Sequence, residues 1–431
     1  MKKKIIQSTM ILIVLSLIAK ALSFIVRIYL ARVMSEDAMS IYSLASPTLV
    51  FLITIAQMGI PAALSKVIAS KDNSRSVVIS SIILSVVNNI IVSALFMIFI
   101  PILSLIILKQ SSIEGVLKAM IPMIPLVTLS GLLKGYLQGK QEHVKACTSQ
   151  IFEEVFRLIF LIIAFTRIDS LTPIKMAEIA MLSICIGEVG SSLYMFLVCM
   201  KKQPILERFH HPIEQITRNS FAELLSISIP MTSSRLIGSL TYFFEPILLV
   251  LKSVDPTSLV RAYGQLNGYV LPIITMPSFI TVTLSSTLLP SFTYENTHGN
   301  PKRARKIFYV MLSVCFFIGL ATSLIVFFFT DECLMLFYHN THGSKFLKSL
   351  ALPFTLYSLQ PVLSSMLHAI DKSKLAMMDT LLGCILRLFI ITFLTPIYKE
   401  QALLIALTSS MLLTTLLHGF HVVYAMFKRV F

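Results

Sequence analysis

The amino-acid sequence predicts an all-α integral membrane protein, and three observations carry this prediction. Of the 431 residues, 56% are hydrophobic and 13% are charged, and the mean hydropathy is +0.83. Apolar runs of about 20 residues, the length that crosses a bilayer as one helix, recur along the whole chain. Lysine and arginine gather in alternate connections between these runs, as they do when one set of loops remains in the cytoplasm.

We expect about twelve membrane-spanning helices, because twelve apolar runs have the required length. Their approximate bounds are 5–31, 42–68, 77–108, 115–137, 147–166, 176–200, 221–251, 260–292, 307–330, 346–370, 375–398 and 402–427. The first run follows three lysines, as the apolar region of a secretion signal does. It is longer than such a region, contains charges and lacks a small-residue cleavage site, so we expect it to remain as the first helix.

The charge distribution predicts the topology and the division of the chain. Both termini and the connections after even-numbered spans contain roughly twice as many lysines and arginines as the opposite connections, which places both termini in the cytoplasm. The longest polar connection, residues 201–220, is predicted to be a cytoplasmic linker between six-helix bundles at 1–200 and 221–431. An even number of spans gives both bundles the same orientation, related by an axis along the membrane normal with a cavity between them.

Basic residues inside the predicted spans are the main candidates for binding. Lys20 and Arg27 are seven residues apart, so they lie within about 20° of one helix face and roughly 10 Å apart along the axis. Arg235 and Arg387 lie near the middle of the seventh and eleventh spans. An ionised group there costs roughly 2.5–3.5 kcal/mol and is normally kept where it faces a wet cavity or a partner. We expect these cations to line a hydrated site; the alternatives are extension to the lipid headgroups or salt bridges between helices.

Two acidic residues inside the spans are candidates for ion coupling. Glu188 lies near the middle of the sixth span, and Glu245 lies ten residues after Arg235. Each is also a candidate salt-bridge partner for Arg235 or Lys20. Pro246 cannot donate a backbone hydrogen bond, and we expect it to kink the helix beside Glu245. The excess of embedded cations over acids favours an anionic ligand over a cationic drug, since guanidinium groups bind oxyanions bidentately.

A third group of charges is expected to be structural. Glu153 and Glu154 precede Arg157 by four and three residues, the favourable order for pairing within one helix. Such a self-neutralised cluster near the cytoplasmic end of the fifth span needs no ligand.

Several other chemistries are not indicated. The six cysteines lie singly, without a C-x-x-C pair, and are interpreted as small core residues. His418 and His421 have no nearby carboxylate or cysteine in the sequence, which favours interfacial packing over a metal site. No P-loop, zinc-protease or serine-hydrolase motif occurs, so we expect no catalytic residue, no metal and no cofactor. The net charge of +15 follows the alternate loops and does not indicate nucleic acid.

Three stretches resemble one group of membrane transporters. They are residues 18–69, beginning IAKALSFIVRIYLAR; residues 132–158, with LLKGYLQGK followed by SQIFEE; and residues 262–292, beginning AYGQLNGYVLP. They are similar to the stage V sporulation protein B group of polysaccharide flippases, occur in both halves and keep that family's order. The superfamily also contains lipid II flippases and multidrug and toxin extrusion antiporters.

The resemblance implies a fold and a substrate class. The implied fold is two six-helix bundles forming a V around a central cavity that opens alternately to either side. The implied substrate is an undecaprenyl-pyrophosphate-linked cell-wall precursor used in making spore peptidoglycan, and Lys20, Arg27 and Arg235 resemble the cationic cavity positions of such flippases. Two features depart from the family: many members have fourteen helices, and residues 366–374 replace a turn that contains Gln-Gly.

The leading hypothesis is a flippase, without enzymatic activity, for an anionic polyprenyl-linked glycolipid in the bacterial cytoplasmic membrane. Lys20, Arg27 and Arg235 would hold the pyrophosphate, Arg387 would assist, and the halves would alternate between two states. An alternative is an ion-coupled exporter of amphipathic cations that uses Glu245 or Glu188. A third hypothesis is a scaffold that recruits cell-wall synthases, for which the embedded charges would be dispensable.

Overall fold

The computed structural model describes residues 2–70, 75–168, 171–202, 218–253, 255–297 and 300–428, and every regular element in them is helical. The chain divides into two compact units, unit 1 at Met1–Phe243 and unit 2 at Phe244–Phe431. The fold is therefore all-α, as the sequence predicts.

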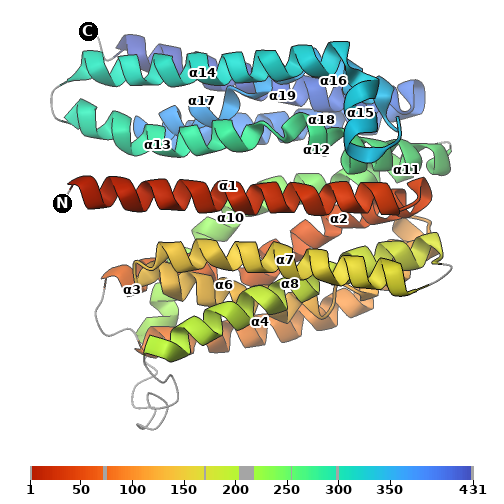
Figure 1. Cartoon of the computed structure of the whole chain (residues 1–431), viewed down its shortest axis with the longest axis horizontal. Coiled ribbons are helices and arrows are strands. Elements are labelled where there is room, and N and C mark those ends of the chain that lie inside the picture. The colour runs from red at the N-terminus through yellow and green to blue at the C-terminus, as the bar shows by residue number, and fades with distance from the viewer. Residues whose placement is uncertain are drawn as a thin grey trace. The chain divides into compact units, whose positions relative to one another are not determined.

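Unit 1 contains the first six predicted spans (Figure 1). Its helices are α1 (Lys2–Val33), α2 (Glu36–Gln57), α3 (Ile60–Ser70), α4 (Arg75–Pro101), α5 (Glu114–Lys118), α6 (Met123–Gly139), α7 (His143–Arg167) and α8 (Pro173–Lys202), with the π-helix η1 (Ile102–Ile107) and the 3-10 helix η2 (Ser111–Ile113). The second span is built from α2 and α3, and the fourth from α5 and α6. Helix α7 packs against both α1 and α8.

Unit 2 contains the remaining spans. Its helices are the second part of α10 (Arg218–Leu251), then α11 (Pro256–Gly264), η3 (Gln265–Val270), α12 (Leu271–Thr275), α13 (Ser278–Thr297), α14 (Pro301–Phe328), α15 (Thr330–Tyr338), α16 (Ser344–Tyr357), α17 (Gln360–Ala369), α18 (Ser373–Tyr398) and α19 (Gln401–Lys428). The short helix α15 was not predicted. Helices α18 and α19 lie side by side, and α14 packs against α13 and α16 (Figure 1).

All twelve predicted spans are helical in the part of the chain that the structure describes. Nine helices there are long and apolar enough to cross a membrane, or up to eleven when each of two bent pairs is counted as one span. Helix α7 is also long, with 25 residues, but it does not meet the same criterion, because Glu153, Glu154 and Arg157 lie near its centre. The charges that mark α7 as a polar site thus also weaken its membrane signal.

Helix α10 crosses the boundary between the two units. Its first half packs in unit 1, where Leu224 joins a core with Ile60 and Leu64 of α3. Further along α10, the ring of Phe243 stacks on Phe51 of α2 at a centroid distance of 4.7 Å. The predicted linker, residues 201–220, lies mostly outside the described residues. The contacts between helices thus place the boundary between the two units within α10, whereas the polar segment of the sequence predicted a boundary before this helix.

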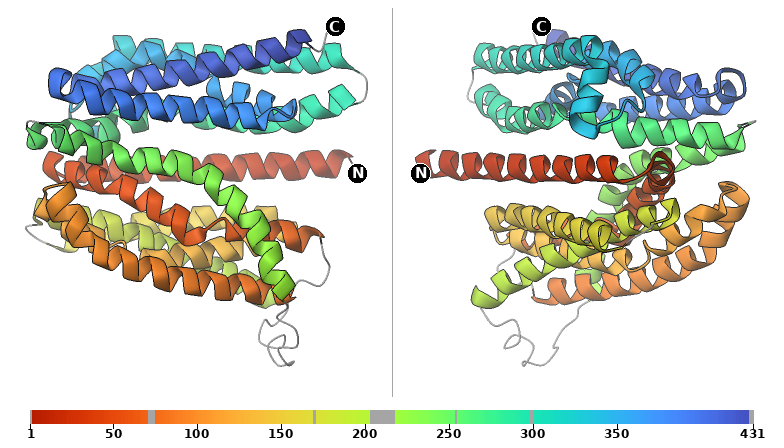
Figure 2. Two further views of the ribbon diagram at one scale, coloured as in Figure 1. Left: turned by 180° about the vertical axis from the view of Figure 1, so that it is seen from behind. Right: turned by 45° about the vertical axis from the view of Figure 1, so that its right-hand side comes forward.

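Helix α10 bends by 43° between Ser220–Ser233 and Arg235–Leu251 (Figure 2). Pro230 lacks the amide hydrogen that would bond to the preceding turn. The hydroxyls of Thr232 and Ser233 donate to the carbonyl oxygens of Ser228 and Ile229, which also bends helices. The predicted kink at Pro246 is therefore not where the large bend occurs.

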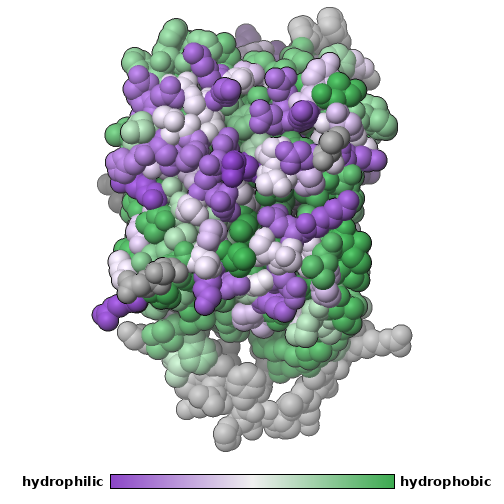
Figure 3. Space-filling model, turned by 90° about the vertical axis from the view of Figure 1, so that its right-hand side faces the viewer, coloured by the Kyte–Doolittle hydropathy of each residue, from purple (hydrophilic) through white to green (hydrophobic). Residues whose placement is uncertain are grey.

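The sides of the helices remain largely hydrophobic. On α4, Ile90, Leu95 and Ile98 are each more than 60% exposed. Exposed apolar faces of this kind fit the hydrocarbon of a bilayer, which is as apolar as the side chains. Figure 3 shows hydrophilic residues gathered over the ends of the helices, on the side where α11 and α15 lie in Figure 1, with hydrophobic residues along the flanks. This distribution matches a protein whose helix ends meet water.

Candidate cationic site and polar clusters

Lys20 and Arg27, both predicted to bind ligand, are exposed residues of α1. The regular helix places both side chains on one face, two turns apart. Lys20 forms no ion pair with any described residue. Arg27 lies within electrostatic range of Glu154 on α7. Helix α1 therefore presents one cation without an acidic partner and a second near a carboxylate that other groups also contact.

Arg235 is the third predicted cation, and it directly follows the bend of α10. Its side chain is exposed and makes no ion pair with the described part of the chain. Gly238 lies three residues later on the same side of the helix, and a Cβ atom placed there would have nothing within 4 Å. The space along this face of α10 is thus open.

Arg387, the fourth predicted cation, is paired. Its guanidinium on α18 donates to Glu245 on α10 at 2.8 Å, and the carboxylate is 1% exposed. The sequence suggested Glu245 as a partner for Arg235 or Lys20, but the structure gives it to Arg387, which lies 142 positions away. Because the pair neutralises both charges, Arg387 differs from the other three cations in this conformation.

A polar cluster in unit 1 joins α6 to α7 and α8. Lys134 of α6 forms an ion pair with Glu153 of α7 at 3.0 Å, and the hydroxyl of Ser130 donates to Glu188 of α8. Glu188 is 6% exposed and also lies within electrostatic range of Lys134. The predicted coupling residue is therefore a buried carboxylate that a neighbouring hydroxyl and ammonium group stabilise.

Arg157 extends this cluster to α2. Its guanidinium donates to the hydroxyls of Ser183 and Tyr42 at 3.1 and 3.3 Å and lies 4.0 Å from Glu154. The pairing predicted within α7 is thus present for Glu154, whereas Glu153 pairs with Lys134 instead. The role of Lys134 as an ion-pair partner was not predicted, because the sequence analysis counted this residue among the cations of a cytoplasmic connection.

Unit 2 contains a second buried group that the sequence did not identify. Asp379 of α18 is 1% exposed, and its Oδ2 lies 2.8 Å from His418 Nδ1 and 3.0 Å from His421 Nδ1, both on α19. The spacing of the two histidines was noted, but their carboxylate lies on the preceding helix. The sequence signal that could have identified this group was an acidic residue, Asp379, within the predicted eleventh span. Among the described residues, no cluster of three His, Cys, Asp or Glu side chains has the geometry for a metal ion.

These contacts separate the embedded charges into two groups. Glu153, Glu154, Glu188, Glu245 and Asp379 each have a polar or charged partner. Lys20 and Arg235 are exposed and have no acidic partner among the described residues. The accessible embedded charge is thus positive, which suits an oxyanion ligand.

Comparison with known proteins identifies the family of the chain. The model of the polysaccharide biosynthesis protein family matches residues 5–294, and the MatE family model matches residues 267–393. Stage V sporulation protein B of Bacillus subtilis (strain 168) is 30% identical over 435 aligned residues, which cover 97% of this chain and 83% of that protein. Lipid II flippase MurJ of the same organism is 22% identical, covering 97% of this chain and 82% of that protein.

Solved structures agree with this family in their fold. An inward-facing multidrug resistance MATE family transporter of the MOP superfamily has a TM-score of 0.70 at 13% identity, covering 96% of this chain and 98% of that chain. The eukaryotic MATE transporter AtDTX14 has a TM-score of 0.63 at 16% identity, covering 96% and 93%. The family model covers more than half of the chain, and similarity to stage V sporulation protein B extends over nearly all of it. The chain therefore belongs to the polysaccharide biosynthesis protein family.

Proposed function

We propose that this protein moves an anionic polyprenyl-linked cell-wall precursor across the bacterial cytoplasmic membrane. The observation that carries the proposal is the asymmetry of the embedded charges: Lys20 and Arg235 are exposed without acidic partners among the described residues, whereas the embedded acids have polar or charged partners. Cations in this state suit a pyrophosphate, which offers several oxyanions for charge-assisted hydrogen bonds.

In this proposal Lys20, Arg27 and Arg235 bind the pyrophosphate. Arg387 assists if a conformational change separates it from Glu245. Transport requires a conformation that binds the headgroup tightly on the cytoplasmic side and a second conformation with lower affinity on the other side. No covalent bond changes.

The relatives support a lipid-linked substrate over a drug. One relative that matches almost the whole chain is named a lipid II flippase, and another is named for a stage of sporulation. We accordingly propose a peptidoglycan precursor with an undecaprenyl pyrophosphate as the substrate and spore formation as the context.

The test is transport of a labelled undecaprenyl-pyrophosphate-linked disaccharide peptide in proteoliposomes. Replacing Lys20 or Arg235 with Ala removes one charge-assisted hydrogen bond, and we expect apparent affinity for the lipid to fall about 10-fold to 100-fold. Lys20→Arg should retain most of the activity. Lys140→Ala and Lys372→Ala remove exposed cations at turns and are matched controls, for which we expect transport near the wild-type rate.

The same vesicles distinguish the other hypotheses. Undiminished transport by the double variant Lys20→Ala/Arg235→Ala would reject the binding role. Efflux of an amphipathic cation that requires an ion gradient and is lost in Glu245→Gln or Glu188→Gln would instead support an exporter. A protein that transports neither substrate, yet retains its cell-wall phenotype when the cations are replaced, would support the scaffold hypothesis.

A further inference from the structure

The first turns of α14 contain an unusual concentration of positive charge. Lys302, Arg303, Arg305 and Lys306 lie within the first six residues of the helix, which begins at Pro301. The N-terminus of a helix carries a partial positive charge from its macrodipole, so cations are unfavourable there and an anion is favourable. The preceding residue, Asn300, makes no side-chain cap to this helix end. Four cations thus lie at the end of the helix where the dipole disfavours positive charge.

Only part of this charge is neutralised within the described residues. Arg303 forms an ion pair with Glu295 of α13 at 3.4 Å. Lys302, Arg305 and Lys306 form no ion pair with any described residue. Three cations and the helix dipole therefore act together at this position, and an external anion would relieve the repulsion among them.

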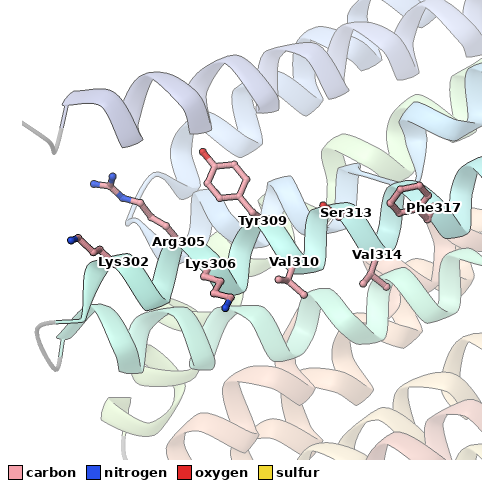
Figure 4. Close-up of a pocket in the computed structure, with 8 residues that line it drawn as sticks. All are labelled: Lys302, Arg305, Lys306, Tyr309, Val310, Ser313, Val314 and Phe317. Atoms are coloured by element: carbon pink, nitrogen blue, oxygen red, sulfur yellow. The ribbon is translucent and has the colours of Figure 1, made fainter.

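An apolar strip continues along the same helix from these cations. A surface groove of about 660 Å³ is lined by Lys302, Arg305 and Lys306 and then by Tyr309, Val310, Ser313, Val314 and Phe317 (Figure 4). The apolar members of this strip are exposed; Val310 is 53% and Phe317 is 65% accessible. The groove thus has basic residues at one end and apolar residues along the rest of it, all on α14.

The dimensions of the strip match one leaflet of a bilayer. Phe317 lies eleven positions after Lys306, which corresponds to roughly 16 Å along the helix axis at 1.5 Å per residue. Half of a hydrocarbon core of about 30 Å is about 15 Å. Tyr309 lies between the cations and the apolar residues, at the level where aromatic residues with a polar tip are enriched in membrane proteins. A lipid whose headgroup contacts the cations would extend its acyl chain as far as Phe317.

We propose that this surface is a binding site for an anionic glycerophospholipid of the cytoplasmic leaflet, such as phosphatidylglycerol. The phosphate would contact Lys302, Arg305 and Lys306, and one acyl chain would lie along Val310, Val314 and Phe317. Clusters of basic residues at the cytoplasmic ends of transmembrane helices recognise anionic headgroups in this way. The lipid would be a bound component of the transporter, and the site does not depend on the transport function proposed above.

The first arm of the test measures lipid binding by the purified full-length protein. Thermal stability in a mild detergent is followed during titration with dioleoyl phosphatidylglycerol or dioleoyl phosphatidylcholine, and native mass spectrometry counts retained lipids. We expect stabilisation and retention with phosphatidylglycerol and neither with phosphatidylcholine. Equal effects of the two lipids on the wild-type protein would overturn the proposal.

The second arm removes the cationic end. Lys302→Gln/Arg305→Gln/Lys306→Gln should weaken phosphatidylglycerol binding roughly 100-fold, because each basic residue near an anionic lipid contributes roughly a fivefold factor. Lys140→Gln/Lys372→Gln/Lys374→Gln removes the same charge from exposed positions outside the groove on α14 and should bind as wild type does. Equal weakening in both variants would show a net-charge effect and contradict a site on α14.

The third arm separates a lipid from a free anion. Phe317→Ala removes the distal apolar contact and should weaken binding of the dioleoyl lipid several-fold, while binding of a dihexanoyl phosphatidylglycerol stays unchanged because its chains are too short to reach Phe317. Inorganic phosphate should give no comparable stabilisation of the wild-type protein. Stabilisation by inorganic phosphate equal to that by the lipid would reduce the surface to a simple anion site and overturn the proposal.

Discussion

At the scale of single residues, the embedded charges of this protein differ mainly in whether they have partners. The carboxylate of Glu245 is buried and pairs with Arg387, whereas Lys20 and Arg235 have no acidic partner among the described residues. A buried ion pair costs desolvation energy, and removing one member leaves the other charge uncompensated. Stability and ligand binding are therefore expected to depend on different basic residues.

A double-mutant cycle tests this separation for the pair. Glu245→Leu leaves the guanidinium of Arg387 without its carboxylate, and Arg387→Met leaves Glu245 buried and unpaired. Each should lower the free energy of unfolding in detergent by about 3–5 kcal/mol. The double variant should recover most of that loss.

The control for this cycle is an exposed cation without an acidic partner. Arg235→Met should change the free energy of unfolding by less than about 0.5 kcal/mol, because nothing buried depends on it. Additive losses from Glu245→Leu and Arg387→Met would mean that the two side chains do not stabilise each other.

At the scale of helices, glycines decide where the bundles pack closely. A Cβ atom on Gly135 of α6 would lie 2.3 Å from the carbonyl oxygen of Pro61 in α3, which cannot move without shifting the backbone. Gly190 of α8 similarly faces the ring of Phe156 on α7. Small residues allow helices to approach closely in membranes, where the hydrophobic effect contributes little to their association.

Paired glycine substitutions measure this effect. Gly135→Ala should separate α6 from α3 and lower the free energy of unfolding by about 1–3 kcal/mol. Gly238→Ala is the matched control in α10, because its Cβ would meet nothing within 4 Å and its helix propensity improves by up to about 1 kcal/mol. Thermal unfolding in detergent is the measurement. Equal melting temperatures for the two variants would contradict the close contact between α6 and α3.

At the scale of the whole molecule, the distribution of lysine and arginine predicts which turns face the cytoplasm. The turns near Lys140 and Lys372 are predicted to be cytoplasmic, and those near Lys109 and Lys399 to be external. All four residues are exposed, so each position is suited to labelling. This topology also sets the leaflet of the lipid site on α14.

Single-cysteine labelling tests the topology. The six native cysteines form no disulfide and can be replaced first by alanine. A membrane-impermeant maleimide applied to intact cells should then label Lys109→Cys and Lys399→Cys but neither Lys140→Cys nor Lys372→Cys, and permeabilised cells should label all four. Labelling of Lys140→Cys in intact cells would invert the predicted orientation.

The sequence predicted much of the fold because membrane helices are specified locally. All twelve predicted spans coincide with helices in the described part of the chain, and charges inside them identified Lys20, Arg235 and Arg387 as unusual. Positions of bends were harder to predict. Pro246 was expected to kink α10, but the bend lies after Pro230, where two hydroxyls also bond back to the preceding turn.

By itself, the sequence determined the helical class, the positions of the long apolar helices and the presence of embedded charges, because each depends on residues that are near neighbours in the chain. Only the tertiary structure decided which of those charges are neutralised. Glu245 meets Arg387, Glu153 meets Lys134, and Asp379 meets two histidines, each across a gap of 19 or more positions. The physical reason is that the packing of helices against one another determines which partner a buried charge meets. The spacing of residues within one helix carries no information about that packing.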